Sequence, residues 1–213
     1  MNKNRTDFLM LDTGSYFGKA RVNDPQYQDD FTFVDTYELP NIYLKPYKCL
    51  VVQGLIDQKF LFRHKEVIRE FLDDKKIVVF SGNLFLDWLP GGSSFIPKTI
   101  LSYKDYEVSI DHRHPIFDGV EEDDMTYNKG VSGFFARGHH PIPEGAEVLL
   151  TLPGGEPITY IDRNSTKGTI LVHAGSDLFG AMNASGTKKR IGPQLIQWVR
   201  DEYSTLQERG EMG

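Results

Sequence analysis

The chain has 213 residues, of which 39% are hydrophobic, so it is long enough for one α/β domain with a sizeable core. Its net charge of −6 excludes the global basic field of a nucleic-acid-binding protein, and no apolar run approaches the roughly 20 residues of a membrane span. Because the single cysteine, Cys49, cannot form an intramolecular disulfide and the first apolar stretch is too short for a signal peptide, we expect a cytoplasmic protein.

Apolar runs that end at turn signals predict the first strands of a mainly parallel sheet. These runs lie at 8–11, 31–34, 49–52 and 77–80. The polar stretch 19–30 is expected to be a loop or a weak helix. Asp57 is placed to cap a helix, and the apolar residues that follow it as far as Leu72 share one helical face. The order strand, strand, strand, helix, strand, with short connections, predicts the α/β class.

Residues 95–160 mix short strand-like runs with many turns, and they are expected to form an antiparallel extension or the far edge of the sheet. The runs lie at 99–103, 107–110, 133–136 and 147–150. Two further strands, 157–161 and 169–173, are joined by a turn that suits a hairpin.

The C-terminal part of the chain predicts a last helix from about Gly192 to Leu206, because its apolar residues share one face. The polar stretch 207–213 is expected to fray. Since no repeat or linker divides the chain, we expect a single domain over 6–206.

The turn after the first predicted strand is a candidate ligand-binding element. In Asp12-Thr13-Gly14-Ser15, the glycine can let backbone N–H groups approach an anion. Aspartic proteases carry the same four residues, with two carboxylates that share a proton. A second such motif is missing here, and the α/β order does not suit that fold.

The second candidate is Ser81-Gly82-Asn83, directly after the fourth predicted strand. Ligands of open α/β folds sit at the carboxyl ends of the strands, where a sharp turn can present a nucleophile. Val79 and Asn83 stand where a hydrolase elbow has glycines, so the residues alone favour a structural turn serine over a nucleophile.

His173 ends another predicted strand and is expected at the same edge of the sheet as Ser81. Asp177 can orient the imidazole or cap the next helical turn. Ser81, His173 and Asp177 would then act as nucleophile, base and orienting carboxylate. A strand-end histidine bonded to the backbone explains the same residues equally well.

Two histidine pairs offer a metal-site alternative, with Asp111 or Asp118 as a further ligand. The pairs are His112 with His114 and His139 with His140. Both pairs precede proline in turns, and neither has the spacing of a helical ligand pair or a facial triad. We therefore expect no metal and no cofactor.

Taken in order, these pieces resemble the domains of class I glutamine amidotransferases. The similar segments are 9–16 (opening strand and turn), 47–54 (strand and Gly-Gly segment), 77–82 (nucleophile elbow) and 168–173 (strand with the catalytic histidine). Residues 114–120, followed by 145–150, are closer to the ThuA-like branch of this superfamily. The resemblance implies a flavodoxin-like three-layer sandwich.

The departures from the family pattern bear on chemistry. The family nucleophile is a cysteine where this chain has Ser81, and the glutamate of its His-x-Glu motif is replaced by Gly175. Leu55 stands where the family has its oxyanion glycine. The resemblance therefore implies the fold and the cleft, but not glutamine hydrolysis.

Two functions stay open on the sequence. The first is a catalytically degenerate protein that binds a small ligand or a partner in the strand-end cleft, without nucleic acid or membrane. Its expected ligand-binding residues are Asp12, Gly14, Ser15, Gly54, Gly82 and Asn83. The second is a small-molecule hydrolase that uses Ser81 and His173, with the N–H of Gly82 or Gly54 holding an oxyanion. Both are compatible with a homo-oligomer.

Overall fold

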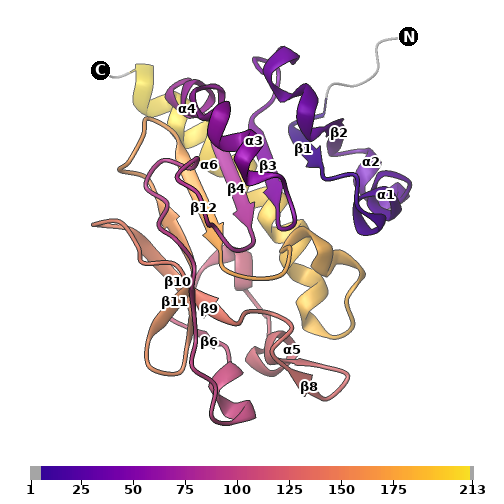
Figure 1. The fold of residues 1–213 in the computed structure, drawn as a ribbon, viewed down its shortest axis with the longest axis vertical. Coiled ribbons are helices and arrows are strands. Elements are labelled where there is room, and N and C mark those ends of the chain that lie inside the picture. The colour runs from indigo at the N-terminus through magenta and orange to yellow at the C-terminus, as the bar shows by residue number, and fades with distance from the viewer. Residues whose placement is uncertain (1–5, 212–213) are drawn as a thin grey trace.

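The computed structural model describes residues 6–211 as an eight-stranded sheet between helices (Figure 1). Its strands are β1 (Phe8–Asp12), β2 (Phe31–Asp35), β3 (Cys49–Gln53), β4 (Ile77–Ser81), β6 (Ser109–Ile110), β10 (Glu147–Leu152), β11 (Glu156–Asp162) and β12 (Thr169–His173). They lie in the order β2-β1-β3-β4-β12-β11-β10-β6. The first five in this order are parallel, and β11, β10 and β6 each run antiparallel to the preceding strand.

This order confirms the predicted fold class. The sequence β2-β1-β3-β4-β12 is the flavodoxin-like arrangement 2-1-3-4-5, and the three remaining strands form the antiparallel extension. The strands expected at 8–11, 31–34, 49–52 and 77–80 are all present, as is the hairpin of β11 and β12.

Helices cover both faces of the sheet. They are α1 (Tyr16–Val22), α2 (Pro25–Gln28), α3 (Gln58–Arg63), α4 (Lys65–Asp73), α5 (Glu122–Thr126) and α6 (Ile191–Glu211). In Figure 1, α3 and α4 lie on one side of the sheet and α6 lies on the other. The fold is therefore a three-layer α/β sandwich.

The remaining elements are short. Two small strand pairs are β5 (Ile96–Pro97) with β9 (Gly138–His139), and β7 (Tyr127–Asn128) with β8 (Val131–Ser132). The 3-10 helices are η1 (Thr36–Asn41), η2 (Tyr103–Tyr106), η3 (Pro115–Phe117), η4 (Phe179–Asn183) and η5 (Thr187–Arg190).

Side-chain alternation along the strands gives each face of the sheet its own core. On β4, Ile77 and Val79 pack in the cluster that contains α6, whereas Val78 and Phe80 pack in the cluster that contains α3 and α4. All four are fully buried, and burial of each such side chain contributes roughly 1.5–3 kcal/mol. Because successive side chains point to opposite faces, Ser81 continues the face that α6 covers.

Several expected elements differ in the structure. The helix after Asp57 is broken at His64 (φ −114°, ψ 22°), whose ring packs against Phe60 with centroids 4.5 Å apart. The run 99–103 is not a strand, because Ser102 and Asp105 form a capping box that begins the 3-10 helix η2.

The longest described helix, α6, extends past Leu206, where the helix was expected to end. The stretch expected to fray at 207–213 is thus helical as far as Glu211, and 212–213 lie outside the described residues. Leu206 is buried, and Gln207 Nε2 donates to the Lys75 carbonyl at 3.1 Å, so tertiary contacts fix these last turns. Within residues 6–211, no helix combines the length and apolar character needed to cross a bilayer.

Candidate functional site

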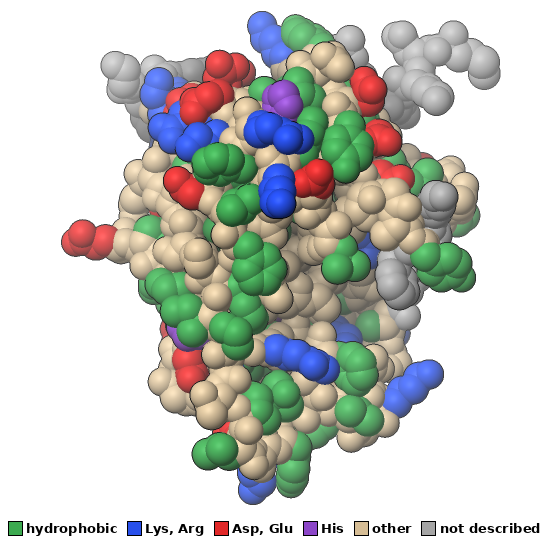
Figure 2. All heavy atoms as spheres, viewed as in Figure 1, with side chains coloured by type: hydrophobic (Ala, Val, Ile, Leu, Met, Phe, Trp, Pro, Cys, Tyr) green, Lys and Arg blue, Asp and Glu red, His purple; other side chains and the backbone are tan. Residues whose placement is uncertain are grey.

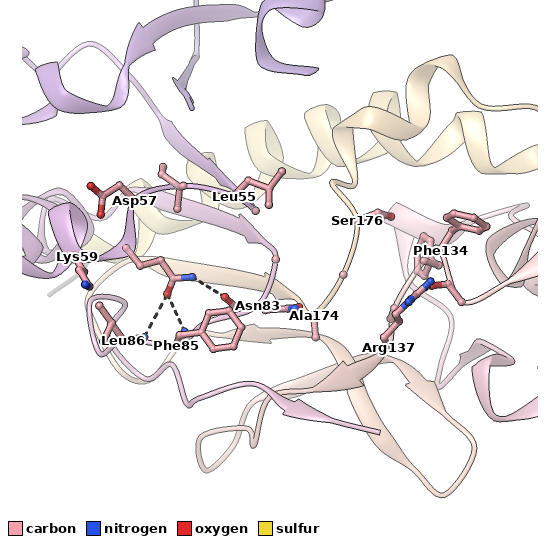
Figure 3. Close-up of a pocket in the computed structure, with 18 residues that line it drawn as sticks. Leu55, Asp57, Lys59, Asn83, Phe85, Leu86, Phe134, Arg137, Ala174 and Ser176 are labelled. Atoms are coloured by element: carbon pink, nitrogen blue, oxygen red, sulfur yellow. Dashed lines mark hydrogen bonds between the residues drawn. The ribbon is translucent and has the colours of Figure 1, made fainter. Parts of the chain in front are cut away.

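A cleft of about 720 Å³ opens at the carboxyl ends of β3, β4 and β12 (Figure 3). Its lining residues fall within four segments, 54–59, 82–86, 133–137 and 174–176. Ligand pockets commonly have volumes of roughly 300–1,000 Å³, and in open α/β sheets they lie at this edge. The cleft therefore has the place and size of a small-molecule site.

Two glycines form a floor without side chains. Gly82 has φ +146°, and a Cβ built on it would lie 2.8 Å from the Cα of Gly54. A Cβ on Gly54 would meet nothing closer than 3.6 Å. The ends of β3 and β4 thus approach each other closely only because residue 82 is a glycine.

One wall comes from the 133–137 segment, which lies against the end of β12. Ala136 forms an isolated antiparallel bridge with Gly175, and the Ser176 N–H donates to the Phe135 carbonyl at 2.9 Å. A Cβ on Gly175 would overlap that carbonyl oxygen. The Phe135 ring also packs on the His173 ring, with centroids 4.7 Å apart. This run was expected to be a strand, but it forms only this bridge.

Gln58 fixes the opposite wall through its amide group. Its Oε1 accepts hydrogen bonds from the N–H of Phe85 (2.8 Å), the N–H of Leu86 (3.3 Å) and the indole of Trp88 (3.2 Å). Its Nε2 donates to the Asn83 carbonyl at 2.7 Å, and Figure 3 shows these bonds to Asn83, Phe85 and Leu86. The role of Gln58 was not predictable from the sequence, because nothing local distinguishes it from other helical glutamines.

Replacing Gln58 with leucine is expected to lower the free energy of unfolding by about 2 kcal/mol, since three donors lose their acceptor. Gln58→Glu keeps that acceptor and loses only the donation to Asn83, so its effect should be smaller. Urea unfolding followed by Trp88 fluorescence measures both variants. Equal stability of Gln58→Leu and the wild type would contradict the role assigned to this amide.

The ionisable side chains of the cleft are Asp57, Lys59 and Arg137. Asp57 is engaged as the cap of α3, since its Oδ1 accepts the Phe60 N–H at 3.0 Å, and this bond holds the pKa of the carboxyl below its usual range. The Nε of Arg137 donates to the Gly133 carbonyl at 2.7 Å. In Figure 3, Lys59 and Arg137 lie at opposite ends of the cleft.

Three of the expected ligand-binding residues, Gly54, Gly82 and Asn83, line the cleft together. The other three lie at the end of β1 and do not line it. Asp12 Oδ1 accepts the Gly14 N–H at 3.0 Å, and Ser15 Oγ accepts the Gly18 N–H at 3.1 Å as the cap of α1. The side chains of Asp12 and Ser15 thus form hydrogen bonds within the turn and at the cap of α1.

Ser81 and His173 lie beneath the floor of the cleft, on the face that α6 covers. They are register partners on neighbouring parallel strands, so their backbones are about 4.8 Å apart. Ser81 is 1% exposed, and its Oγ accepts the Leu178 N–H at 3.4 Å. His173 is fully buried, and its Nδ1 lies 2.7 Å from Thr159 Oγ1. Burial lowers the pKa of His173 to about 3, so its imidazole is neutral at physiological pH.

Asp177 is engaged away from His173. Its Oδ2 forms an ion pair with Arg21 at 2.7 Å, and its Oδ1 accepts the Phe179 N–H at 3.2 Å. Of the two roles that the sequence leaves for Asp177, these contacts match the cap of the next turn. Burial raises the pKa of this carboxyl above its usual range, although Arg21 opposes the shift.

Three histidines of the metal-site alternative, His112, His114 and His140, form other hydrogen bonds. His140 is buried, and its Nε2 accepts the Leu84 N–H at 3.0 Å. His112 lies between Asp111 (3.3 Å) and Glu147 (3.0 Å) on the surface. Within the part of the chain that the structure describes, no three His, Cys, Asp or Glu side chains are grouped to hold a metal ion.

No family model and no curated protein matches the chain. Among solved structures, it is similar to a cold-adapted β-galactosidase from Rahnella sp. R3, with a TM-score of 0.51 and 12% identity over 92% of this chain. The match covers 31% of the β-galactosidase, so this chain spans about a third of its length. It is also similar to a glutamine amidotransferase from Thermotoga maritima, with a TM-score of 0.47, 15% identity, and coverage of 94% of this chain and 93% of that chain. At such identities the likeness is one of fold alone.

Proposed function

We propose that this chain is a cytoplasmic, glutamine amidotransferase-like protein of the ThuA-like branch that binds a small molecule in the strand-end cleft without hydrolysing glutamine. The observation that carries the proposal is the separation of the cleft from the reactive side chains. The cleft has an open glycine floor at Gly54 and Gly82, whereas Ser81 and His173 are buried below it. A preformed concave site from which neither Ser81 nor His173 is accessible suits binding better than catalysis by that pair.

The cysteine of the chain also argues against thiolate chemistry. Cys49 is fully buried in β3, and burial raises the pKa of its thiol. Reactive cysteines need an accessible, electropositive environment that lowers the thiol pKa. The place that resembles the nucleophile elbow is held by Ser81, which carries no thiol.

The alternative is a hydrolase in which Ser81 attacks and His173 takes its proton. The register pairing of these two residues on β4 and β12 favours it. Two observations oppose it. The low pKa of His173 makes its imidazole a weak general base at neutral pH. The Gly82 N–H, one of the two expected oxyanion donors, already donates to the His173 carbonyl at 2.9 Å.

A thermal-shift screen against a metabolite library tests the proposal and the alternative together. A ligand present at about 100 times its Kd adds roughly 2.7 kcal/mol to the stability, which raises Tm by about 5–10 °C. We expect the same shift in the wild type and in Ser81→Ala, with the ligand recovered unchanged. Ser176→Trp, which fills the cleft at an exposed position, should abolish the shift.

The matched control is Ser204→Trp, which adds the same bulk at an exposed position of α6 outside the cleft and should keep the shift. A ligand that the wild type consumes and Ser81→Ala does not would favour the hydrolase. A shift that survives in Ser176→Trp would place the ligand elsewhere and contradict the proposed site.

A further inference from the structure

Large apolar side chains are exposed along the cleft. The exposed fractions are 82% for Leu55, 61% for Phe85 and 56% for Phe134, and all three line the cavity. Figure 2 shows hydrophobic side chains exposed over the middle and the lower end of one face, with Lys and Arg side chains among them. Large apolar side chains exposed around a cavity are typical of a site that binds an apolar group.

The charge of the cleft is opposite to that of the whole chain. The chain carries a net charge of −6, but the cleft has two cations, Lys59 and Arg137, against the single carboxylate of Asp57. That carboxylate already accepts hydrogen bonds from the Phe60 N–H (3.0 Å) and the Tyr37 hydroxyl (3.3 Å). A cationic cleft in an acidic protein selects an anionic group.

Arg137 is held so that its terminal amino groups are available. Its Nε bond to the Gly133 carbonyl, 2.7 Å long, restrains the side chain at the wall formed by 133–137. Among the described residues, Arg137 forms no ion pair. A restrained guanidinium offers a planar pair of donors that matches a carboxylate and loses little entropy on binding.

At the ends of β4 and β12, several backbone donors that a phosphate would use are already engaged. The N–H groups of Gly82 and Gly175 both donate to the His173 carbonyl at 2.9 Å, and that of Ala174 donates to Ile158 at 2.7 Å. The Ser176 N–H donates to Phe135. Phosphate sites are commonly built from several unpaired backbone amides. The cleft therefore suits an anion that one guanidinium can satisfy.

We propose that the ligand of this cleft is an aromatic carboxylic acid, with its carboxylate on Arg137 and its ring between Phe134, Phe85 and Leu55. This inference rests on the proposed function and adds the chemical class of the ligand. Arg137 acts as the specific anchor. Lys59, at the other end of the cleft, contributes only to the positive electrostatic potential of the cleft.

The test compares two probes of the same shape, 2-naphthoate and the neutral 2-naphthalenemethanol, by isothermal titration calorimetry. We expect the wild type to bind naphthoate more tightly than the alcohol. Arg137→Gln should weaken naphthoate binding by about 10- to 100-fold, the effect of losing a charged hydrogen-bonded pair, and leave the alcohol unchanged. Lys59→Gln, which removes the same charge at the far end, should change naphthoate binding by less than about twofold. Phe134→Ala should weaken both probes.

Three outcomes would overturn the inference. They are absence of naphthoate binding at millimolar concentration, equal affinity for both probes, and equal loss in Arg137→Gln and Lys59→Gln. The third outcome would mean that naphthoate affinity depends on the total charge of the cleft and not on a specific contact with Arg137. Equal affinity for both probes, lost in Phe134→Ala, would leave the proposed small-molecule site intact and remove only the carboxylate. Unchanged Tm values confirm that each variant is folded.

Discussion

Acidification from pH 7 to pH 4 is expected to destabilise this protein by about 3 kcal/mol for each of its two fully buried histidines, His140 and His173. Burial lowers the pKa of His140 to about 4 and that of His173 to about 3, whereas the unfolded chain keeps the usual value of 6.5. Below pH 6.5 the unfolded state therefore binds protons that the native state excludes. Their contribution to stability is fully present above pH 6.5 and is lost as the pH falls toward the two native pKa values.

The variant that isolates this effect is His140→Gln. A glutamine can keep an acceptor for the Leu84 N–H but cannot bind the proton. Between pH 4.5 and 6, the slope of unfolding free energy against pH should fall by about 1.4 kcal/mol per pH unit relative to the wild type. Urea unfolding at a series of pH values measures this slope. Parallel curves for the wild type and His140→Gln would show that His140 takes up a proton as readily in the native state as in the unfolded state.

His112→Gln is the control of opposite sign. The hydrogen bond to Glu147 raises the pKa of His112, with Asp111 adding to the effect. Its stabilising contribution is therefore present below pH 6.5 and is lost as the pH rises through the native pKa. His112→Gln should therefore leave the slope between pH 4.5 and 6 unchanged and make the slope of unfolding free energy against pH more positive only above about pH 6.5.

The second large effect is expected at the glycine floor. Gly82→Ala should destabilise the protein by roughly 3 kcal/mol, because φ +146° is unfavourable for alanine and its Cβ would lie 2.8 Å from the Cα of Gly54. The ends of β3 and β4 would have to separate, which also changes the cleft. Thermal or urea unfolding measures the loss of stability. A change in the affinity for a ligand of the cleft shows whether the shape of the cleft has changed.

Gly54→Ala is the matched control, since it adds the same methyl group on the facing residue of the same floor. Its Cβ would meet only atoms at 3.6 Å or beyond, which is ordinary van der Waals contact. We expect a change within about 1 kcal/mol. Similar losses in Gly54→Ala and Gly82→Ala would mean that the floor tolerates no side chain at either position, and the asymmetry argued from backbone geometry would be wrong.

Much of the fold could be predicted because its central strands are buried on both faces. Runs such as 49–52 and 77–80 are apolar without interruption and end at glycine-containing turns, which predicts parallel strands. Because these runs do not alternate between apolar and polar residues, the sequence does not show which face of the sheet each side chain occupies. The residues alone therefore place Ser81 at a strand end, but they do not show that it faces α6 below the floor.

The site was predictable only where it follows from strand ends. Of the residues expected to bind a ligand, Gly54, Gly82 and Asn83 line the cleft, because the cleft opens where parallel strands finish. The walls depend on tertiary contacts that local patterns do not encode. The 133–137 segment lies beside β12 through its bridge to Gly175, and Gln58 holds the 83–88 loop with a single amide group. The preference of 133–136 for a strand was overridden by this placement.

The order of the strands also has a consequence for folding. β4 and β12 are neighbours in the centre of the sheet, yet residues 82–168 separate them in sequence. Pairing them requires closure of that long loop, which makes such a topology slow to form. Since the cleft needs both strand ends, we expect it to form after the rate-limiting step of folding. A molecule bound there would then slow unfolding without accelerating folding.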